Sequence, residues 1–400
     1  MKPKILVIGE NSVTPMGIIR ALGQKGYDID VVYFTKPDNK SDVIKSCRYV
    51  NRVTDIPKTE TYRFYDVIKK DYADGNWFLF PSCDLSAELI SKIDDETKKH
   101  VYMQYSKSYS IPSLLEKNLQ NKLAGECGLK TPNEVVVSLS DENPAIPNSV
   151  TYPCFVKPLV SATGNKTEMA VCGNSEELRK HLAKIRKTDS NRKVLVQDYL
   201  NITKEYTIGG VCTENEVYIP GIIKKKVIAR LNKGVTLMGE IVPNSEIGEN
   251  YALVEAFLKK TGFVGMFDLE LMITDNGCYF GELNLRAGGP SYAYTYLGCN
   301  LPDFTVRSIM DNSEPVPKDK PQQGKFFVNP KVLFEDYRSL LISSKEFKEI
   351  LSGSDFNLLT DKSDPEPEKV FMSQVKNKVQ YKRFKRFVKN TLIRAGLLHK

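Results

Sequence analysis

The chain has 400 residues, of which 41% are hydrophobic and 26% charged, and its formal net charge is +8. This length is too great for one compact core and predicts two or three packed units of ordinary globular composition. The sequence has no apolar run of about 18 residues, which excludes a membrane-spanning helix, and the run at 5–8 is too short for a secretory signal. We therefore expect a cytoplasmic protein.

The residue types that most often bind zinc or act as nucleophiles are scattered. The eight cysteines form no C-x-x-C pair and mostly lie in apolar stretches, which favours buried, reduced thiols over a zinc site or a disulfide framework. The three histidines lie at positions 100, 181 and 399. Zinc or triad chemistry that depends on histidine is therefore not expected.

The chain opens with the pattern of a parallel sheet. An apolar strand at 5–8 is followed by a helix at 16–25 and by a second strand at 29–34. Strand, helix and strand in this order specify a parallel unit. The first turn lacks G-x-G-x-x-G, which argues against a dinucleotide site.

The first predicted domain ends near residue 112. Its strand at 77–81 runs into Ser82-Cys83-Asp84, at the edge where open α/β sheets bind ligands. Asp84 either contacts a ligand there or caps the helix that follows. Beyond the boundary, a helix at 114–124 opens the second unit.

A lysine closes the predicted strand at 152–158. Lys157 is followed by a small, flexible loop that includes Ser161 and Gly164. Loop N–H groups and hydroxyls can hold phosphate oxygens while the ammonium neutralises their charge, so the stretch suits a triphosphate. The alternative is a surface lysine beside a generic turn.

The strand at 194–200 becomes polar near its end. Such a segment can present backbone groups to a purine edge while aromatic and apolar side chains pack on its face. The residues concerned are Gln197, Asp198, Tyr199 and Leu200. Glu205 then opens the next strand.

A predicted strand at 218–223 leads into three lysines at 224–226 and on to Arg230. This positive cluster either meets an anionic substrate or is a solvated run of charge.

The most informative stretch is a predicted hairpin over 267–285. Its strands are apolar and aromatic, and Asp275-Asn276-Gly277 supplies the positive φ angles that a tight turn needs. Glu282 and Asn284 then share one face, and we expect Asp268 to lie across from Glu282.

Carboxylate and amide oxygens that converge in this way suit Mg²⁺, which leaves its other positions to water and phosphate. Arg286 continues the alternation, and its planar guanidinium can hold phosphate oxygens beside the metal. The pattern therefore predicts a metal-phosphate site. A solvated hairpin face with ordinary surface acids is the alternative.

The positive charge belongs to the C-terminal tail. Residues 376–400 contain nine Lys or Arg and no acid, so the net charge of +8 leaves the first 375 residues almost neutral. Apolar residues recur at near-helical spacing among these cations, which fits a helix on an anionic membrane surface. A helix docked on its own protein is the alternative; a nucleic-acid arm is less favoured, and we expect no nucleic-acid partner.

In this order, the residues from 1 to about 310 resemble the ATP-grasp superfamily, and the closing F-D…E-L-N-L-R motif is the most specific part. The resemblance implies an α/β protein in which a Rossmann-like parallel-sheet (pre-ATP-grasp) domain precedes a two-lobed α+β ATP-grasp domain. The implied divisions are 1–112 for the first domain, 113–315 for the second with lobes at 113–195 (small) and 196–315 (large), 316–372 for an extension of the core and 373–400 for the basic amphipathic tail.

The resemblance also implies ATP and Mg²⁺ as cofactors and gives roles to the residues already named. Lys117 and Lys157, with the loop at Ser161 and Gly164, would bind the phosphates. The segment from Gln197 to Leu200 would hold adenine, and Glu205 the ribose hydroxyls.

By the same resemblance, Asp268, Glu282 and Asn284 would bind the metal. Arg286 would steady the transferring phosphate, and Arg230 would lie near the substrate.

Among relatives, the closing motif looks most like bacterial carboxylate-amine ligases such as the D-aspartate ligases of cell-wall cross-bridges. This implies that a small carboxylic acid, an amino acid for example, is activated as an acyl phosphate and joined to an amine. A catalytically inactive protein that binds nucleotide or tethers a partner is the alternative. A nicotinamide-dependent oxidoreductase would need the glycine-rich turn that is missing. Either a monomer or a homo-oligomer is compatible with the sequence.

Overall fold

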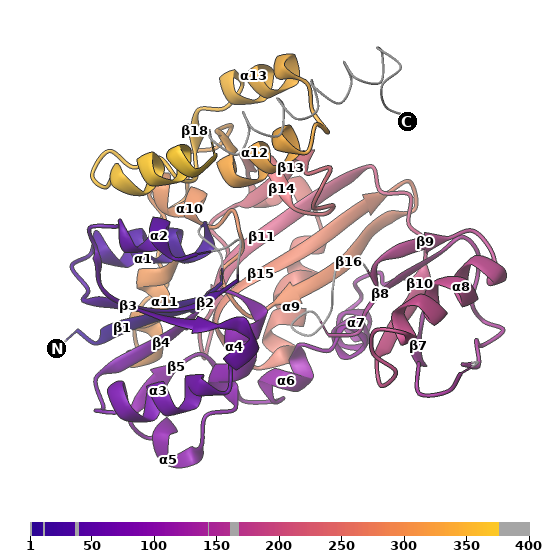
Figure 1. Ribbon diagram of the computed structural model, residues 1–400, viewed down its shortest axis with the longest axis horizontal. Coiled ribbons are helices and arrows are strands. Elements are labelled where there is room, and N and C mark those ends of the chain that lie inside the picture. Colours follow the sequence, from indigo (N-terminus) through magenta and orange to yellow (C-terminus); the bar gives the residue numbers. More distant parts are fainter. Residues whose placement is uncertain (1, 11–12, 37–39, 143, 161–167, 376–400) are drawn as a thin grey trace, which may run out of the picture.

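The computed structural model describes residues 2–10, 13–36, 40–142, 144–160 and 168–375. Figure 1 shows the N-terminal domain and a smaller lobe on either side of a large central sheet, with the C-terminal helices above it. Two predicted phosphate-loop residues, Ser161 and Gly164, and the cationic tail at 376–400 lie outside the described residues. Membrane contact by the tail therefore stays a prediction.

The N-terminal domain is built on a parallel sheet with the strand order β3-β2-β1-β4-β5. Ile5 and Val7 of β1 enter one hydrophobic core and Leu6 and Ile8 enter another, because alternate side chains of a strand point to opposite faces. Both faces are therefore covered, as parallel sheets require. The elements are β1 (Lys4–Gly9), α1 (Thr14–Gly23), β2 (Ile29–Thr35), α2 (Asp42–Lys45), β3 (Val50–Pro57), α3 (Arg63–Asp71), β4 (Trp77–Pro81), α4 (Asp84–Ser91), α5 (Asp95–Lys98) and β5 (Val101–Met103).

The small lobe is an antiparallel sheet with the order β7-β10-β8-β9. One face packs on α8 (Ser175–Arg186) through Leu178, Leu182 and Ile185. The other face carries Lys157. The strands are β7 (Glu134–Ser138), β8 (Cys154–Pro158), β9 (Ala170–Cys172) and β10 (Lys193–Asp198).

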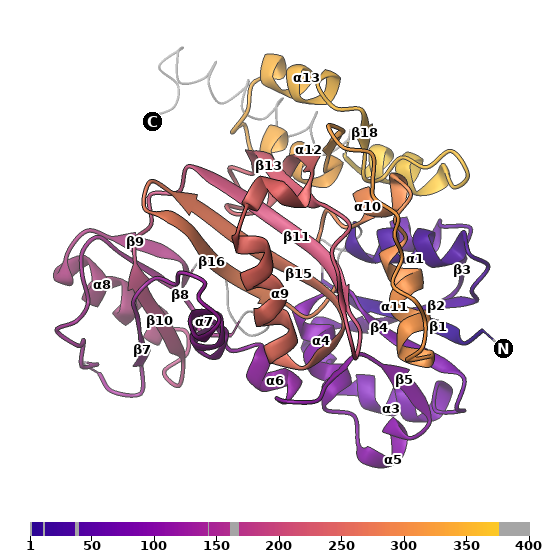
Figure 2. The same ribbon diagram turned by 180° about the vertical axis from the view of Figure 1, so that it is seen from behind.

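The central sheet runs in the order β16-β15-β11-β13-β14-β17-β18 and contains the predicted hairpin as β15 and β16. Figure 2 shows α9 (Asn250–Thr261) lying across its back, where Val254, Phe257 and Leu258 are buried. The strands are β11 (Lys204–Cys212), β12 (Val217–Tyr218), β13 (Ile222–Ile228), β14 (Thr236–Val242), β15 (Phe263–Thr274), β16 (Gly277–Asn284), β17 (Phe326–Val328) and β18 (Phe356–Asn357), and β6 (Tyr105–Ser106) pairs with β15.

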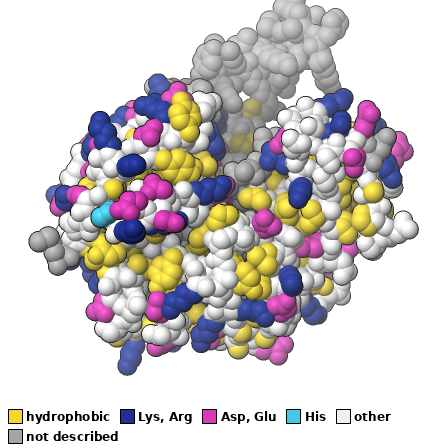
Figure 3. Space-filling view, turned by 90° about the horizontal axis from the view of Figure 1, so that it is seen from below, with side chains coloured by type: hydrophobic (Ala, Val, Ile, Leu, Met, Phe, Trp, Pro, Cys, Tyr) yellow, Lys and Arg dark blue, Asp and Glu magenta, His cyan; other side chains and the backbone are white. Residues whose placement is uncertain are grey.

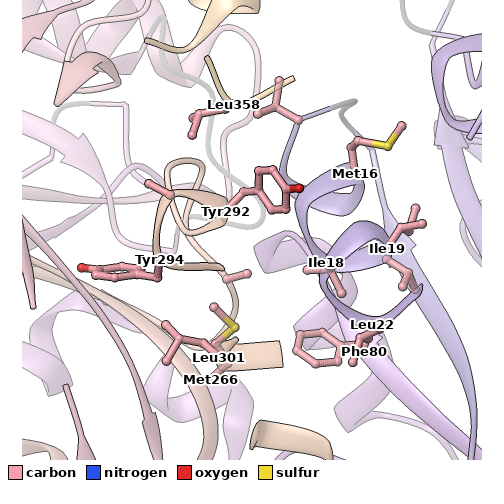
Figure 4. Packing of buried hydrophobic residues seen from close by; sticks show 14 of the residues in the cluster. Met16, Ile18, Ile19, Leu22, Phe80, Met266, Tyr292, Tyr294, Leu301 and Leu358 are labelled. Carbon is pink, nitrogen blue, oxygen red and sulfur yellow. The ribbon is translucent and has the colours of Figure 1, made fainter. Parts of the chain in front are cut away.

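Two of the remaining helices tie the central sheet to the N-terminal domain. Figure 4 shows Tyr292 and Tyr294 of α10, Leu301 of α11 and residues of α1 in one hydrophobic core. The helices of this core are α10 (Tyr292–Tyr296) and α11 (Leu301–Met310), whereas α12 (Pro330–Arg338) and α13 (Ser344–Ser352) pack in a separate cluster with Leu237 of β14. Leu358, Leu359 and Phe371 are buried in the same core as α1, so the segment beyond residue 315 also packs there.

A buried arginine joins the C-terminal segment to α1. Arg20 is fully buried and donates hydrogen bonds to Asp364 Oδ2 (2.9 Å) and to the carbonyl oxygens of Leu359 (2.6 Å) and Asp364 (2.7 Å). Asp364 also accepts from the backbone N–H of Arg48 (3.0 Å). The C-terminal segment and the N-terminal domain therefore share a buried ion pair.

Two predicted elements differ from the structure. The helix expected at 114–124 is two helices, α6 (Ile111–Leu114) and α7 (Lys117–Glu126), because Glu116 is extended and bridges to Val160. The strand expected at 218–223 is interrupted between β12 and β13, at Pro220-Gly221, where proline lacks a ladder donor. The lysines at 224–226 consequently lie inside β13 and do not follow a strand.

The described surface is of mixed charge on the face shown in Figure 3, where Lys and Arg side chains are interspersed with Asp and Glu. In the described ranges, no helix combines the length and the apolar character that crossing a membrane requires.

Candidate active site

The register of the hairpin decides which acids face each other. Glu282 pairs with Glu270, and Asp268 pairs with Asn284. The predicted pairing of Asp268 with Glu282 is therefore wrong. Two shifts of one residue each cause the difference. Thr274 pairs with Gly277, so the turn is centred between Asp275 and Asn276, and an irregularity at Gly281 adds one residue to β16 between the Phe280–Leu271 and Glu282–Glu270 pairs.

This register adds Glu270 to the predicted set. Glu270 and Asp268 are two residues apart on β15, and Glu282 and Asn284 are two residues apart on β16, so all four share one face of the sheet. The alternation Asp268-Leu-Glu270-Leu in the sequence indicated that Glu270 shares a face with Asp268. Which residue of β16 lies opposite Glu270 depends on the position of the bulge.

Two lysines from other elements come close to this face. Lys117, at the start of α7, lies with its Nζ 3.5 Å from Glu282 Oε2 and 3.5 Å from the carbonyl oxygen of Pro158. Its backbone N–H donates to Leu159 (3.1 Å), which connects α7 to the end of β8. Lys157 on β8 is only 8% exposed. The predicted phosphate-binding lysines are thus brought together with Glu282.

The cations control the ionisation of Glu282. Burial alone would raise the pKa of Glu282, but Lys117, Lys157 and Arg286 outweigh it and hold this pKa at about 2. Glu282 is consequently a carboxylate at neutral pH. The surrounding positive charge is what a polyphosphate would need.

Arg286 approaches the acids at Asp268. Its Nη1 is 3.6 Å from Asp268 Oδ2, and its Nε donates to Asp84 Oδ1 (3.0 Å). Burial raises the pKa of Asp268 to about 7, although Arg286 opposes this shift. The loop after β16 also approaches Asp268 closely, because a Cβ at Gly288 would clash with Asp268 Oδ1 and force the carboxylate to move.

Lys157 has a lowered pKa of about 8, because it is buried and Lys117 is nearby. Its ammonium is therefore charged below about pH 8 and neutral above it. Only the charged ammonium attracts phosphate, and its population falls about tenfold for each pH unit above the pKa. We therefore expect the affinity for MgADP to fall by up to about tenfold for each pH unit above 8. Calorimetric titration between pH 7 and 9.5 measures this.

Lys157→Arg is the matched control, because guanidinium stays charged throughout that range. Protonation of the nucleotide itself affects both proteins equally. The difference between their plots of MgADP affinity against pH therefore reports the ionisation of Lys157 alone. Parallel curves for the wild type and the variant would contradict the role of Lys157 as the titrating cation.

A third lysine, missed in the sequence, lies beside the acids. Lys225 of β13 is buried, and its Nζ is 2.9 Å from Glu205 Oε2 and 2.9 Å from Glu270 Oε1. Burial would lower its pKa, but Glu270 and Glu205 outweigh this and raise it. The sequence did not predict which of the three lysines at 224–226 is buried, because the lysine that points inward depends on where β13 starts.

The predicted adenine segment lies at the end of β10. Gln197 is 6% exposed, and its Oε1 is buried with no hydrogen-bond partner in the described part of the chain. Asp198 accepts from Asn133 Nδ2 (2.7 Å) and from Thr151 Oγ1, and Tyr199 is 46% exposed. A buried amide oxygen without a partner is an available acceptor for a ligand. Leu200 follows Tyr199, and Glu205, assigned to ribose, is the second residue of β11.

Arg230 is not brought together with the other predicted residues. Its guanidinium donates to the carbonyl oxygen of Leu341 (2.5 Å) and to Glu346 (2.7 Å), and its backbone N–H donates to Asp336 (2.7 Å). These partners belong to α12, α13 and the turn between them. Arg230 thus holds the C-terminal segment against the loop after β13.

The hairpin acids form an oxygen donor set of the kind that Mg²⁺ takes. Two carboxylates, Glu270 and Glu282, face each other beside the amide of Asn284, whose Nδ2 is 3.4 Å from Glu282 Oε1. The described residues contain no cluster of three or more His, Cys, Asp or Glu side chains able to hold a metal. Mg²⁺ needs no such cluster, since it keeps waters and binds substrate phosphates. The residues present therefore fit a magnesium ion shared with a nucleotide.

Comparisons with known proteins identify the fold. No protein-family model matches the chain. The biotin carboxylase domain of the Hydrogenobacter thermophilus 2-oxoglutarate carboxylase, solved in complex with MgADP, ADP and bicarbonate, superposes with a TM-score of 0.62 at 16% identity and covers 82% of this chain and 74% of that one. The chain has the ATP-grasp fold, and the predicted fold class is confirmed.

Two further proteins are similar to parts of the chain. The L-amino acid ligase from Bacillus licheniformis superposes with a TM-score of 0.55 at 15% identity and covers 80% of this chain and 79% of that one. The carbamoyl phosphate synthase large chain of Helicobacter pylori is 27% identical over 172 residues, 40% of this chain. That match spans only 15% of the synthase, so the similarity is distant.

Proposed function

We propose that the protein is an ATP- and Mg²⁺-dependent, ADP-forming ligase that activates a small carboxylic acid as an acyl phosphate and joins it to an amine. One observation carries this proposal. Lys117 of α7, Lys157 of β8 and Arg286 of the loop after β16 place three cations around the ionised carboxylate of Glu282.

Phosphoryl transfer needs positioning and charge neutralisation more than covalent chemistry from the protein. The carboxylate oxygen of the acid attacks the γ-phosphorus of ATP, and ADP leaves. The amine then attacks the acyl carbon, phosphate leaves, and the amine nitrogen loses a proton. The lysines and Arg286 would neutralise the phosphates in both steps, with Gln197 and its neighbours holding adenine.

Magnesium, when bound, would neutralise charge on the phosphates and orient them. Glu270, Glu282 and Asn284 would hold it, with Asp268 as the further acid predicted from the sequence. Lys225 would keep Glu270 and Glu205 in place, since it pairs with both at 2.9 Å.

The fold-level likeness to an L-amino acid ligase supports an amino acid as the activated acid. The resemblance of the closing motif to D-aspartate ligases extends the proposal to a cell-wall or surface-polymer role, with an amine on a lipid or nucleotide carrier. A cytoplasmic location, at the inner face of the membrane if the tail binds there, is part of the same proposal.

The test is ADP release from MgATP by the purified full chain, screened against amino acids as the acid and cell-wall precursors as the amine. We expect release that requires both partners and an amide product detected by mass spectrometry. Nucleotide binding without turnover for any pair of acid and amine would contradict the proposal and favour a catalytically inactive binding protein.

A further inference from the structure

Arg286 is held by an acid from the N-terminal domain. Its Nε donates to Oδ1 of Asp84 at 3.0 Å, and both side chains are 17% exposed. On its other side, Nη1 lies 3.6 Å from Asp268. The guanidinium is therefore fixed from two directions, by one acid of its own hairpin and by one that comes 202 residues earlier.

Asp84 occupies the first position of α4, directly after β4 and Ser82-Cys83. An acid at a helix start often serves only to complement the helix dipole. Asp95 occupies the equivalent position of α5 in the same domain, yet its side chain is 96% exposed and pairs with Lys98. An aspartate at the first position of a helix in this domain therefore need not contact another domain. The contact of Asp84 with Arg286 is not explained by its place at a helix start.

We propose that Asp84 is a positioning residue for Arg286, so that the N-terminal domain completes the site that receives the transferring phosphate. This inference rests on the proposed function. Asp84 takes the Nε hydrogen and so fixes the plane of the guanidinium. Nη1 donates to the carbonyl oxygen of Ala287 (3.2 Å) and lies beside Asp268, so Nη2 is the terminal nitrogen suited to a phosphate contact. An arginine ordered in advance loses less rotamer entropy when the phosphate arrives.

The consequence is specific to one phosphate. Lys117 and Lys157 are assigned to the nucleotide phosphates in general, which include those of ADP, whereas Arg286 is assigned to the group that is transferred. Loss of Asp84 should therefore weaken binding of the β,γ-imido analogue of ATP and leave MgADP binding nearly unchanged. A purely structural defect would weaken both nucleotides together.

The experiment compares Asp84→Asn, Arg286→Gln, the double variant and the control Asp95→Asn as full chains. Calorimetry measures the dissociation constants of MgADP and of the imido analogue, so no substrate needs to be known. We expect Asp84→Asn to lower the preference for the imido analogue over ADP at least about fivefold. The double variant should show no further loss beyond Arg286→Gln, because Asp84 acts through the arginine.

Asp84→Glu keeps the charge and should recover part of the preference, and Asp95→Asn should leave it unchanged. A preference that stays within twofold of the wild type, or rises, in Asp84→Asn would overturn the inference, as would additive losses in the double variant. A wild-type chain that bound neither nucleotide would instead overturn the proposed function, and this inference with it.

Discussion

Glu282→Gln is expected to reduce ATP-dependent turnover by about 10²–10³-fold while the protein stays folded. Glutamine has nearly the same size, so packing of β16 is kept, but the negative charge that faces Lys117, Lys157 and Arg286 is lost. An anionic metal ligand is lost with it. ADP release under saturating MgATP, with circular dichroism as the measure of folding, checks this result.

Asp275→Asn is the matched control, because it removes an acid from the same hairpin at its exposed tip. It should turn over at the wild-type rate. Glu282→Gln with wild-type turnover would remove the metal-phosphate assignment of the hairpin.

Arg20→Met is expected to cost about 3–5 kcal/mol in the free energy of unfolding, because it leaves Asp364 buried without its cation. Asp364 is 1% exposed, and Arg20 also satisfies the carbonyl oxygen of Leu359. Methionine fills much of the same space, so the loss is mainly electrostatic. Denaturant unfolding monitored by fluorescence and circular dichroism measures it.

Arg52→Met is the control from the same domain. Arg52 pairs with Asp71 at 2.8 Å, but its side chain is 55% exposed, so solvent screens the pair and the change should stay within about 1 kcal/mol. Equal decreases in the free energy of unfolding of the two variants would show that the buried Arg20–Asp364 pair stabilises the contact between the C-terminal segment and α1 no more than an exposed pair would.

The parallel N-terminal sheet could be predicted because its strands are short apolar runs separated by a helical pattern. The apolar strands and the turn of the hairpin were equally local signals, and Lys157 at a strand end could be read in the same way. Each of these features depends on neighbouring residues along the chain. Local steric and hydrophobic preferences are therefore enough to give them.

Other features depended on residues that are distant in sequence. Arg230 follows a run of lysines and looked like part of a substrate site, but Leu341 and Glu346 occupy its guanidinium. The partner of Arg20 comes more than 300 residues later. Such contacts are decided by how the elements pack, and no local pattern encodes them.

The amino-acid sequence by itself determined the order of the elements, the two kinds of sheet and the residue types of the candidate site. Only the tertiary structure decided which carboxylates meet, because the turn centre and the additional residue at Gly281 each shift the register by one residue and together place Glu282 opposite Glu270 instead of Asp268. It also decided which of three consecutive lysines is buried and which domain holds Arg286. Side-chain alternation has a period of two, so one shift would turn Glu282 away from the acids and the second shift brings it opposite the next acid on the same face.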